Sequence, residues 1–247
     1  MVVTGGGKGI GRAAVAAFAG RGDTVIAVGR DRRALAETVA AVASLEGAVS
    51  AEVCDVTDEE AVTSLFERLD AVDVLVNNAG VAVSAPVHRL TLQDWNRHLA
   101  VNSTGFFLCA RAVLGAMRER GEGRIVVIAS IAALRGLPYT AAYSASKHAA
   151  VGFMRSLAAE VAGSGVTANA VCPTYVDTEM TERTIGRIAE STGRTRAEAE
   201  AAIASQSPLG RLLDPKEVAA AALFLASSEA ASINGQTLVL DGGGIQG

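Results

Sequence analysis

The sequence predicts an α/β fold in which one doubly wound parallel sheet of about seven strands is covered by helices on both faces. Short runs rich in β-branched residues alternate with longer, alanine-rich stretches that have helical periodicity. The strand runs are almost continuously apolar, which is typical of strands buried on both faces of a sheet. An alternation of this kind joins parallel strands through right-handed helical crossovers.

The elements follow in order along the chain. Strands are expected at Val2–Thr4, Thr24–Val28, Ala48–Val53, Val74–Asn77, Arg124–Ala129, Val166–Val171 and Thr237–Leu240. Helices are expected at Gly11–Gly20, Arg32–Leu45, Glu59–Leu69, Asn96–Arg120, Tyr143–Ala162 and Pro215–Ala226. Met1 runs directly into the first strand, the pattern of a strand cut short, so it stays open whether the native chain begins further upstream.

One polar segment, Glu179–Gln206, stands between a strand and the next helix and is rich in Glu, Arg and Thr. Long insertions at such a place usually form lids or substrate loops. With no repeat, linker or low-complexity tract elsewhere, we expect a single domain over residues 1–247 that carries a substrate lid at about 179–206.

Composition excludes several classes of protein. Half of the 247 residues are hydrophobic and 19% are charged, so the chain can bury a sizeable core. The longest apolar runs, such as Ile125–Ala129, are too short to span a bilayer, and no secretory signal is visible. A net charge of −4 argues against a nucleic acid partner. We expect a cytoplasmic protein with no membrane partner.

Neither cysteine nor histidine spacing indicates a metal site. The cysteines form no Cys-x-x-Cys pair, so reduced thiols are expected at Cys54, Cys109 and Cys172. Structural or surface roles are expected for His88, His98 and His148.

The segment Thr4–Gly11, Thr-Gly-Gly-Gly-Lys-Gly-Ile-Gly, lies between the first strand and the first helix. Glycines let the backbone approach a pyrophosphate, and a helix N-terminus offers free N–H groups and a positive dipole end. The alternative, a glycine-rich turn without a ligand, is disfavoured by the strand and helix beside it. We therefore expect a Rossmann-type dinucleotide site with contacts at Gly5, Gly7, Lys8, Gly9, Ile10 and Gly11.

The end of the second strand indicates which dinucleotide binds. An NAD site usually places an acidic residue there to accept from the ribose 2′-OH, whereas this chain has Arg30 followed by Asp31. A guanidinium can grip a 2′-phosphate in bidentate fashion, and Lys8 can lie over the same phosphate. The two cations favour NADP(H). NAD(H) stays open, since a small shift brings Asp31 toward the ribose.

Tyr143 and Lys147 are spaced i, i+4 on a helical pattern, which puts both side chains on one helix face. An ammonium stabilises a neighbouring phenolate, so we expect Lys147 to lower the pKa of Tyr143 and make it an acid–base group. Ser130 follows the fifth strand at the edge where ligands bind, and its hydroxyl can hold a carbonyl oxygen.

Together these features resemble the short-chain dehydrogenase/reductase family over essentially the whole chain. The matching stretches are Thr4–Gly11, Asp55-Val56, Asn77–Gly80, Asn102, Ser130, Tyr143–Lys147, Asn169–Pro173 and Asp241–Gly243. The resemblance implies hydride transfer without a metal, in which the cofactor carries the hydride and the protein supplies positioning and a proton.

The resemblance also implies catalytic roles. Tyr143 is the general acid in reduction, or the base in alcohol oxidation, and Ser130 orients the carbonyl. Lys147 binds the nicotinamide ribose and tunes Tyr143. Asn102 holds a water that links Lys147 to bulk solvent; alternatively, Asn102 caps a helix kink.

Further cofactor contacts are implied by the same resemblance. Asp55 and Val56 meet the adenine. Asn78, Ala79 and Gly80 pass beside the adenosine ribose and support the central strand. The nicotinamide carboxamide and the phosphates are met by Val176 and Thr178.

Within the family, the chain is similar to bacterial 3-oxoacyl-thioester reductases, polyketide ketoreductases and 3-hydroxyacyl dehydrogenases. This similarity implies NADP(H)-dependent reduction of a small-molecule or thioester ketone to a secondary alcohol. Two alternatives stay open: an NAD-dependent secondary-alcohol or 3-hydroxyacyl dehydrogenase, and a non-catalytic dinucleotide-sensing regulator. The second is disfavoured because all four catalytic residues are present.

Two more expectations follow from the family. Its members usually form homotetramers through the two long helices, here Asn96–Arg120 and Tyr143–Ala162, and the last strand. The family commonly has glycine after the position of Pro173, whereas this chain has Thr174-Tyr175. Tyr175 either reshapes the pocket near the nicotinamide or packs outward.

Overall fold

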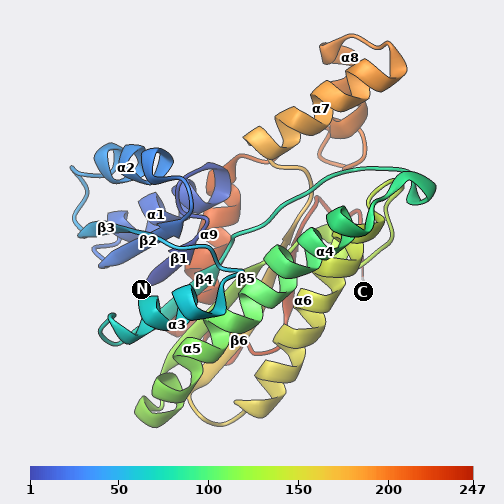
Figure 1. Cartoon of the computed structure of the whole chain (residues 1–247). Coiled ribbons are helices and arrows are strands. Elements are labelled where there is room, and N and C mark those ends of the chain that lie inside the picture. The colour runs from blue at the N-terminus through green and yellow to red at the C-terminus, as the bar shows by residue number, and fades with distance from the viewer. Residues whose placement is uncertain (247) are drawn as a thin grey trace.

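The computed structural model describes residues 1–246, and its core is a seven-stranded parallel sheet (Figure 1). The strands lie in the order β3-β2-β1-β4-β5-β6-β7. Their bounds are Val2–Thr4 (β1), Val25–Gly29 (β2), Val49–Val53 (β3), Val74–Asn77 (β4), Gly123–Ile128 (β5), Val166–Pro173 (β6) and Thr237–Leu240 (β7). The predicted doubly wound α/β fold is confirmed.

Helices cover both faces of the sheet. One face carries α1 (Gly9–Gly20), α2 (Arg32–Ala41) and α9 (Pro215–Leu225). The other face carries α3 (Glu59–Glu67), α5 (Gly105–Arg120) and α6 (Ala141–Glu160). Strands β1, β2, β4, β5 and β6 supply nearly continuous runs of buried residues to both layers, which explains why these strand runs show no polar alternation. The edge strands β3 and β7 are only partly buried.

The chain order reverses where β1 lies between β2 and β4. The last residues of β1 and β4, Thr4 and Asn77, are register partners at this point. In open α/β sheets the ligand crevice lies outside the carboxyl ends of the strands at such a reversal. This edge is therefore where the fold positions a site.

The long helix expected at Asn96–Arg120 begins earlier, with α4 (Leu92–Leu99), and reaches α5 through a π-helical turn, Ala100–Thr104. The start is set by Thr91, whose Oγ1 accepts a hydrogen bond from the Asp94 N–H at 3.0 Å. The sequence-based start was wrong because this capping residue was overlooked.

The segment Leu92–Arg120 is long and apolar enough, by length and composition alone, to cross a membrane. The mean hydropathy of its most apolar 18-residue window is 1.4. The sequence-based expectation of no membrane-spanning segment considered only uninterrupted apolar runs and did not include this helix. The core helix of a soluble protein passes the same test, and Phe106, Val113 and Met117 of this segment are buried in the core. One such helix is weak evidence for a membrane span.

The polar segment expected to form a lid folds into two helices, α7 (Glu179–Thr192) and α8 (Arg196–Ala204). They form a hairpin that projects from the body of the molecule (Figure 1). A small cluster of Ile185, Ala199 and Ile203, separate from the two main clusters, holds the helices together. The hairpin begins directly after β6, so its first turn lies beside the carboxyl edge of the sheet.

Candidate active site

The loop between β1 and α1 has a backbone that side chains would disrupt. Gly5 and Gly9 adopt positive φ angles of 66° and 48°, a region that favours glycine. At Gly11, a Cβ atom would overlap the carbonyl oxygen of Gly5. Gly11 therefore contributes close packing under the loop and does not line the cavity described below.

Hydrogen bonds join this loop to the end of β4. The Asn78 side chain donates from Nδ2 to the carbonyl oxygens of Thr4, at 3.0 Å, and Gly5, at 3.2 Å. The buried Thr4 hydroxyl accepts from the N–H groups of Asn78 and Ala79, both at 3.0 Å. Asn78 thus supports the central strands, as the sequence predicts.

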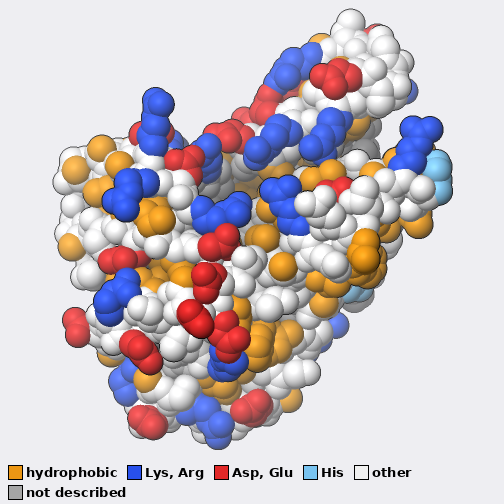
Figure 2. Space-filling view, in the orientation of Figure 1, with side chains coloured by type: hydrophobic (Ala, Val, Ile, Leu, Met, Phe, Trp, Pro, Cys, Tyr) orange, Lys and Arg blue, Asp and Glu red, His pale blue; other side chains and the backbone are white. Residues whose placement is uncertain are grey.

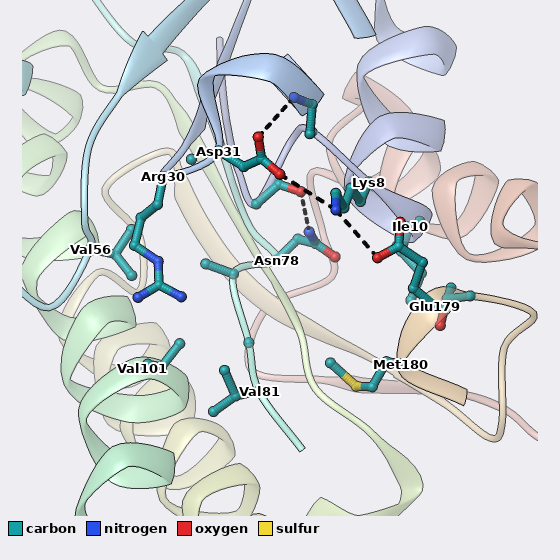
Figure 3. A pocket seen from close by; sticks show the side chains of 18 of the residues that line it. Lys8, Ile10, Arg30, Asp31, Val56, Asn78, Val81, Val101, Glu179 and Met180 are labelled. Carbon is teal, nitrogen blue, oxygen red and sulfur yellow. Dashed lines mark hydrogen bonds and ion pairs between the residues drawn. The ribbon is translucent and has the colours of Figure 1, made fainter. Parts of the chain in front are cut away.

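A cavity of about 340 Å³ opens over the glycine loop (Figure 3). It brings together twelve of the predicted cofactor residues: Gly5, Gly7, Lys8, Gly9, Ile10, Arg30, Asp55, Val56, Asn78, Ala79, Gly80 and Thr178. Its volume lies within the range usual for ligand sites. Residues from β1, β2, β3 and β4 ends and from the lid all meet there, although they are far apart in the sequence.

Two cations of this cavity, Lys8 and Arg30, are paired with carboxylates. Lys8 Nζ lies 3.5 Å from Asp31 Oδ2 and 3.3 Å from Glu179 Oε2 (Figure 3). Arg30 Nη1 lies 3.3 Å from Asp55 Oδ2. Charged side chains of both signs are interspersed along the hollow below the lid hairpin (Figure 2).

Asp31 is the residue that could bind the ribose 2′-OH of NAD(H), and it has two partners within the protein. Its Oδ1 accepts from the Ala34 N–H at 3.1 Å and caps α2. This hydrogen bond and the ion pair with Lys8 lower the pKa of Asp31. Its carboxylate is thereby held at the helix start.

Sequence reasoning missed several lining residues of this cavity: Ala34, Leu35, Val81, Val101, Glu179, Met180 and Arg183. The last three belong to the first turns of α7. The available signal was Thr178, which follows β6 and precedes an acidic turn, the pattern of a helix start.

A second cavity of about 120 Å³ lies beside the first and shares Ile10, Thr178 and Met180 with it. Ser130 and Tyr143 line its floor together with Val176. Its other walls come from the segments after β4, β5 and β6 and from α7, at Ala82, Val83, Ser84, Ala129, Ile131, Leu137, Thr140, Pro173, Thr174, Tyr175, Thr181 and Thr184. The two cavities thus place the glycine loop and Tyr143 on neighbouring parts of the same edge of the sheet.

Tyr143 differs from its sequence-based expectation in one respect. Burial raises its pKa to about 12, and hydrogen bonding with Ser130 offsets this only in part. The prediction that Lys147 lowers this pKa was wrong. The Lys147 ammonium lies 5.9 Å from the centre of the Tyr143 ring, and the group that lowers the pKa of Tyr143 is Ser130. The hydroxyl of Tyr143 therefore stays protonated at neutral pH.

Lys147 is buried behind this surface and lines neither cavity. Its Nζ donates to the carbonyl oxygen of Ile128 at 2.8 Å. Burial lowers its pKa to about 8. A Cβ atom on Gly80 would lie 3.6 Å from Lys147 Nζ and 3.3 Å from Asn102 Oδ1, so both atoms lie close to Gly80, which itself lines the first cavity.

Asn102 lies buried in the π-helical turn between α4 and α5. Its Oδ1 accepts from the Val81 N–H at 2.8 Å, and its Nδ2 donates to the Val81 carbonyl at 3.0 Å and to Ser146 Oγ at 2.9 Å. These bonds tie the helix kink to the segment after β4 and to α6. The alternative role expected for Asn102, that of a polar residue at a helix kink, agrees with this geometry.

Tyr175 is half-buried, lines the second cavity and packs against the lid cluster around Ile185. His98 is fully buried: its Nε2 accepts from the Val83 N–H at 2.9 Å, and its Nδ1 lies 2.6 Å from the Asp94 carbonyl. His98 thus has the structural role predicted for it and fixes one wall of the second cavity. Within residues 1–246, no group of His, Cys, Asp and Glu could hold a metal ion.

A family model described as enoyl-(acyl carrier protein) reductase matches residues 5–244. The chain belongs to the short-chain dehydrogenase/reductase family. It is an oxidoreductase of that family. The resemblance inferred from the motifs is therefore correct over nearly the whole chain.

Curated members of the short-chain dehydrogenase/reductase family resemble the chain along its length. The D-threitol dehydrogenase of Mycolicibacterium smegmatis is 42% identical, with 98% of this chain and 91% of the relative covered. The 3-oxoacyl-[acyl-carrier-protein] reductase of Thermotoga maritima is 35% identical, with 98% of this chain and 96% of the relative covered.

Solved structures of the family superpose closely. An actinorhodin polyketide ketoreductase variant with NADPH has a TM-score of 0.94 and 35% identity over 98% of this chain and 95% of its own. A structure described as a gluconate 5-dehydrogenase from Beutenbergia cavernae, with bound NADP, has a TM-score of 0.90 and 40% identity over 98% of this chain and 94% of its own.

The lowered pKa of Lys147 predicts a pH dependence of stability. Folding lowers this pKa from its ordinary value of 10.5 to about 8, so between these pH values the unfolded chain binds more protons than the folded chain. The contribution of Lys147 to the free energy of unfolding should rise with pH across this window, by up to about 1.4 kcal/mol per pH unit.

The Lys147→Met variant lacks this group and serves as the reference. Urea denaturation of both proteins between about pH 8 and pH 10 gives the difference in their free energies of unfolding. We expect the free energy of unfolding of the wild-type protein to increase relative to that of the variant as the pH rises. A difference that stays constant or falls would contradict the burial of a charged Lys147.

Proposed function

We propose that this protein is an NADP(H)-dependent ketoreductase that converts a ketone to a secondary alcohol, with Tyr143 as the general acid. The observation that carries the proposal is that the cavity over the glycine loop and the cavity lined by Ser130 and Tyr143 are neighbours that share Ile10, Thr178 and Met180 as lining residues. Ser130 and Tyr143 would hold the carbonyl of a substrate in the second cavity, beside a nicotinamide bound from the first.

The first cavity fits a dinucleotide. The loop at Gly5 and Gly9 leaves room for backbone N–H groups to approach a pyrophosphate, and the N-terminus of α1 points at the same place. Thr178 lies beside this loop, because a Cβ atom on Gly9 would contact it at 3.0 Å. Asp55 and Val56 form the far wall, on the side assigned to the adenine.

The preference for NADP(H) rests on the end of β2. Arg30 and Lys8 line the cavity there, and both can bind a 2′-phosphate. Asp31 is engaged by Ala34 and Lys8, which opposes the role of a ribose acceptor in an NAD site. Two similar structures of the family contain NADPH and NADP.

In the proposed reaction, the bound reduced nicotinamide supplies a hydride to the carbonyl carbon. Tyr143 donates its hydroxyl proton to the carbonyl oxygen. Ser130 Oγ, held by the Ala132 N–H at 3.1 Å, orients the same oxygen. We propose that Lys147 binds the ribose hydroxyls beside Gly80 and that Asn102 holds a water for proton return.

The proposed substrate is a 3-oxoacyl thioester or a polyketide-like ketone. The second cavity is walled mainly by apolar side chains, among them Val83, Leu137 and Met180, which suits an acyl chain or a ring system. Tyr175 and Thr184 come from the β6–α7 segment, so the α7–α8 hairpin acts as the lid over this substrate. Relatives named as 3-oxoacyl reductases and polyketide ketoreductases support this choice.

A second candidate function is an NAD-dependent dehydrogenase of a secondary alcohol. It is favoured by the carboxylates around Lys8 and Arg30, which reduce the positive charge available to a 2′-phosphate. The D-threitol dehydrogenase relative is consistent with it.

We further propose that the protein acts in the cytoplasm as a homotetramer, without a nucleic acid or membrane partner. Phe107 of α5 is 39% exposed and packs edge-on against Phe153 of α6, giving these helices an outward apolar face. Sedimentation should give a tetramer, and a monomer at assay concentration would contradict this part of the proposal.

The Tyr143→Phe variant tests the mechanism. It removes the acidic proton but keeps the ring, so we expect kcat to fall at least about 100-fold. The dissociation constant for NADPH, measured by the change in NADPH fluorescence, should change little, since Tyr143 lines the second cavity rather than the first. Turnover near the wild-type rate in this variant would refute the assigned acid.

A further inference from the structure

The charges that line the first cavity are balanced in number. Three cations, Lys8, Arg30 and Arg183, face three carboxylates, Asp31, Asp55 and Glu179. A site of this kind does not attract a phosphate through net charge alone. Which partner each cation keeps therefore decides how strongly the site favours a phosphorylated cofactor.

Lys8 is the cation with two competing partners. Asp31 lies 3.5 Å away and Glu179 lies 3.3 Å away, so the ammonium is shared between the body of the domain and the lid helix (Figure 3). The side chains of Lys8 and Glu179 are 50% and 60% exposed. An ion pair this exposed is weak and can exchange partners.

The two carboxylates are held differently. Asp31 caps α2 through Ala34, so its position is fixed by the body of the domain. Glu179 is the first residue of α7, where the helix dipole stabilises a negative charge, and only its side chain reaches back to the glycine loop. One turn further, Arg183 Nε donates to the Glu179 carbonyl at 3.1 Å, and Arg183 belongs to no ion pair within the described chain.

We propose that Glu179, on the lid helix, is a determinant of cofactor specificity: it competes with the 2′-phosphate of NADP(H) for Lys8. NAD(H) carries a neutral hydroxyl at this position and meets no such competition. The inference rests on the proposed dinucleotide site but not on which cofactor the wild-type protein prefers. It assigns to the lid a role in choosing the cofactor, in addition to covering the substrate.

Neutralising Glu179 therefore favours NADPH over NADH. Exposed ion pairs contribute little, so the expected change in the ratio of the two dissociation constants is about two- to fivefold toward NADPH. The effect should shrink as salt rises, because the charges involved are partly exposed and are screened by ions.

The experiment compares Glu179→Gln with wild type and with Glu190→Gln as the matched control. Glu190 is an exposed residue of the same helix and takes part in no ion pair within residues 1–246. Dissociation constants for NADPH and NADH are measured by cofactor fluorescence at low and high salt. We expect the ratio to move toward NADPH in Glu179→Gln alone, and less at high salt.

A double-mutant cycle tests whether Glu179 acts through Lys8. In a Lys8→Gln background, Glu179→Gln should leave the ratio unchanged, because the contested cation is gone. An unchanged ratio in the single Glu179→Gln variant, or an equal change in both backgrounds, would overturn the inference. The wild-type ratio reports separately on the proposed NADP(H) preference, so failure of one proposal is distinguishable from failure of the other.

Discussion

The hydrogen bonds between Thr4 and Asn78 hold together the two strand ends on which the whole site depends. Thr4 ends β1 and Asn78 follows β4, so their contact closes the sheet at the point where the chain order reverses. The glycine loop is fixed by the same side chain, since Asn78 also donates to Gly5. Loop, cavity and second cavity are all positioned from this junction.

The two ends of the site are different electrostatic environments. At the glycine loop, charged groups are exposed and balanced in number, and Lys8 and Arg30 are paired with carboxylates, which suits a polar cofactor that enters and leaves. At the catalytic end, burial dominates: it raises the pKa of Tyr143 and lowers that of Lys147, so both groups favour their neutral forms more than in water.

The lid connects these environments. Met180 lines both cavities, Glu179 reaches the glycine loop, and Tyr175 joins the substrate cavity to the hydrophobic cluster of the hairpin. A change in the position of α7 therefore affects both cavities together.

Much of this architecture could be predicted from local sequence. The apolar runs predicted the strands of the sheet, and the segment Thr4–Gly11 predicted the glycine loop, because both features depend on residues adjacent in the chain. The Glu179 partner of Lys8 could not be predicted, since it lies 171 positions away and is set by the lid. The pKa of Tyr143 was mispredicted for a related reason: helical spacing places Lys147 on the same face but does not reveal how deeply both residues are buried.

The most direct test of the account is ketone-dependent oxidation of NADPH by the wild-type protein, with NADH measured in parallel. A 3-oxoacyl-CoA, a bicyclic ketone such as a decalone and a simple 2-oxo ester cover the proposed substrate classes. The account predicts consumption of NADPH that requires the ketone and is faster than consumption of NADH. Faster turnover with NADH would contradict the assignment of Lys8 and Arg30, and no ketone-dependent oxidation of either cofactor would contradict the proposed reaction.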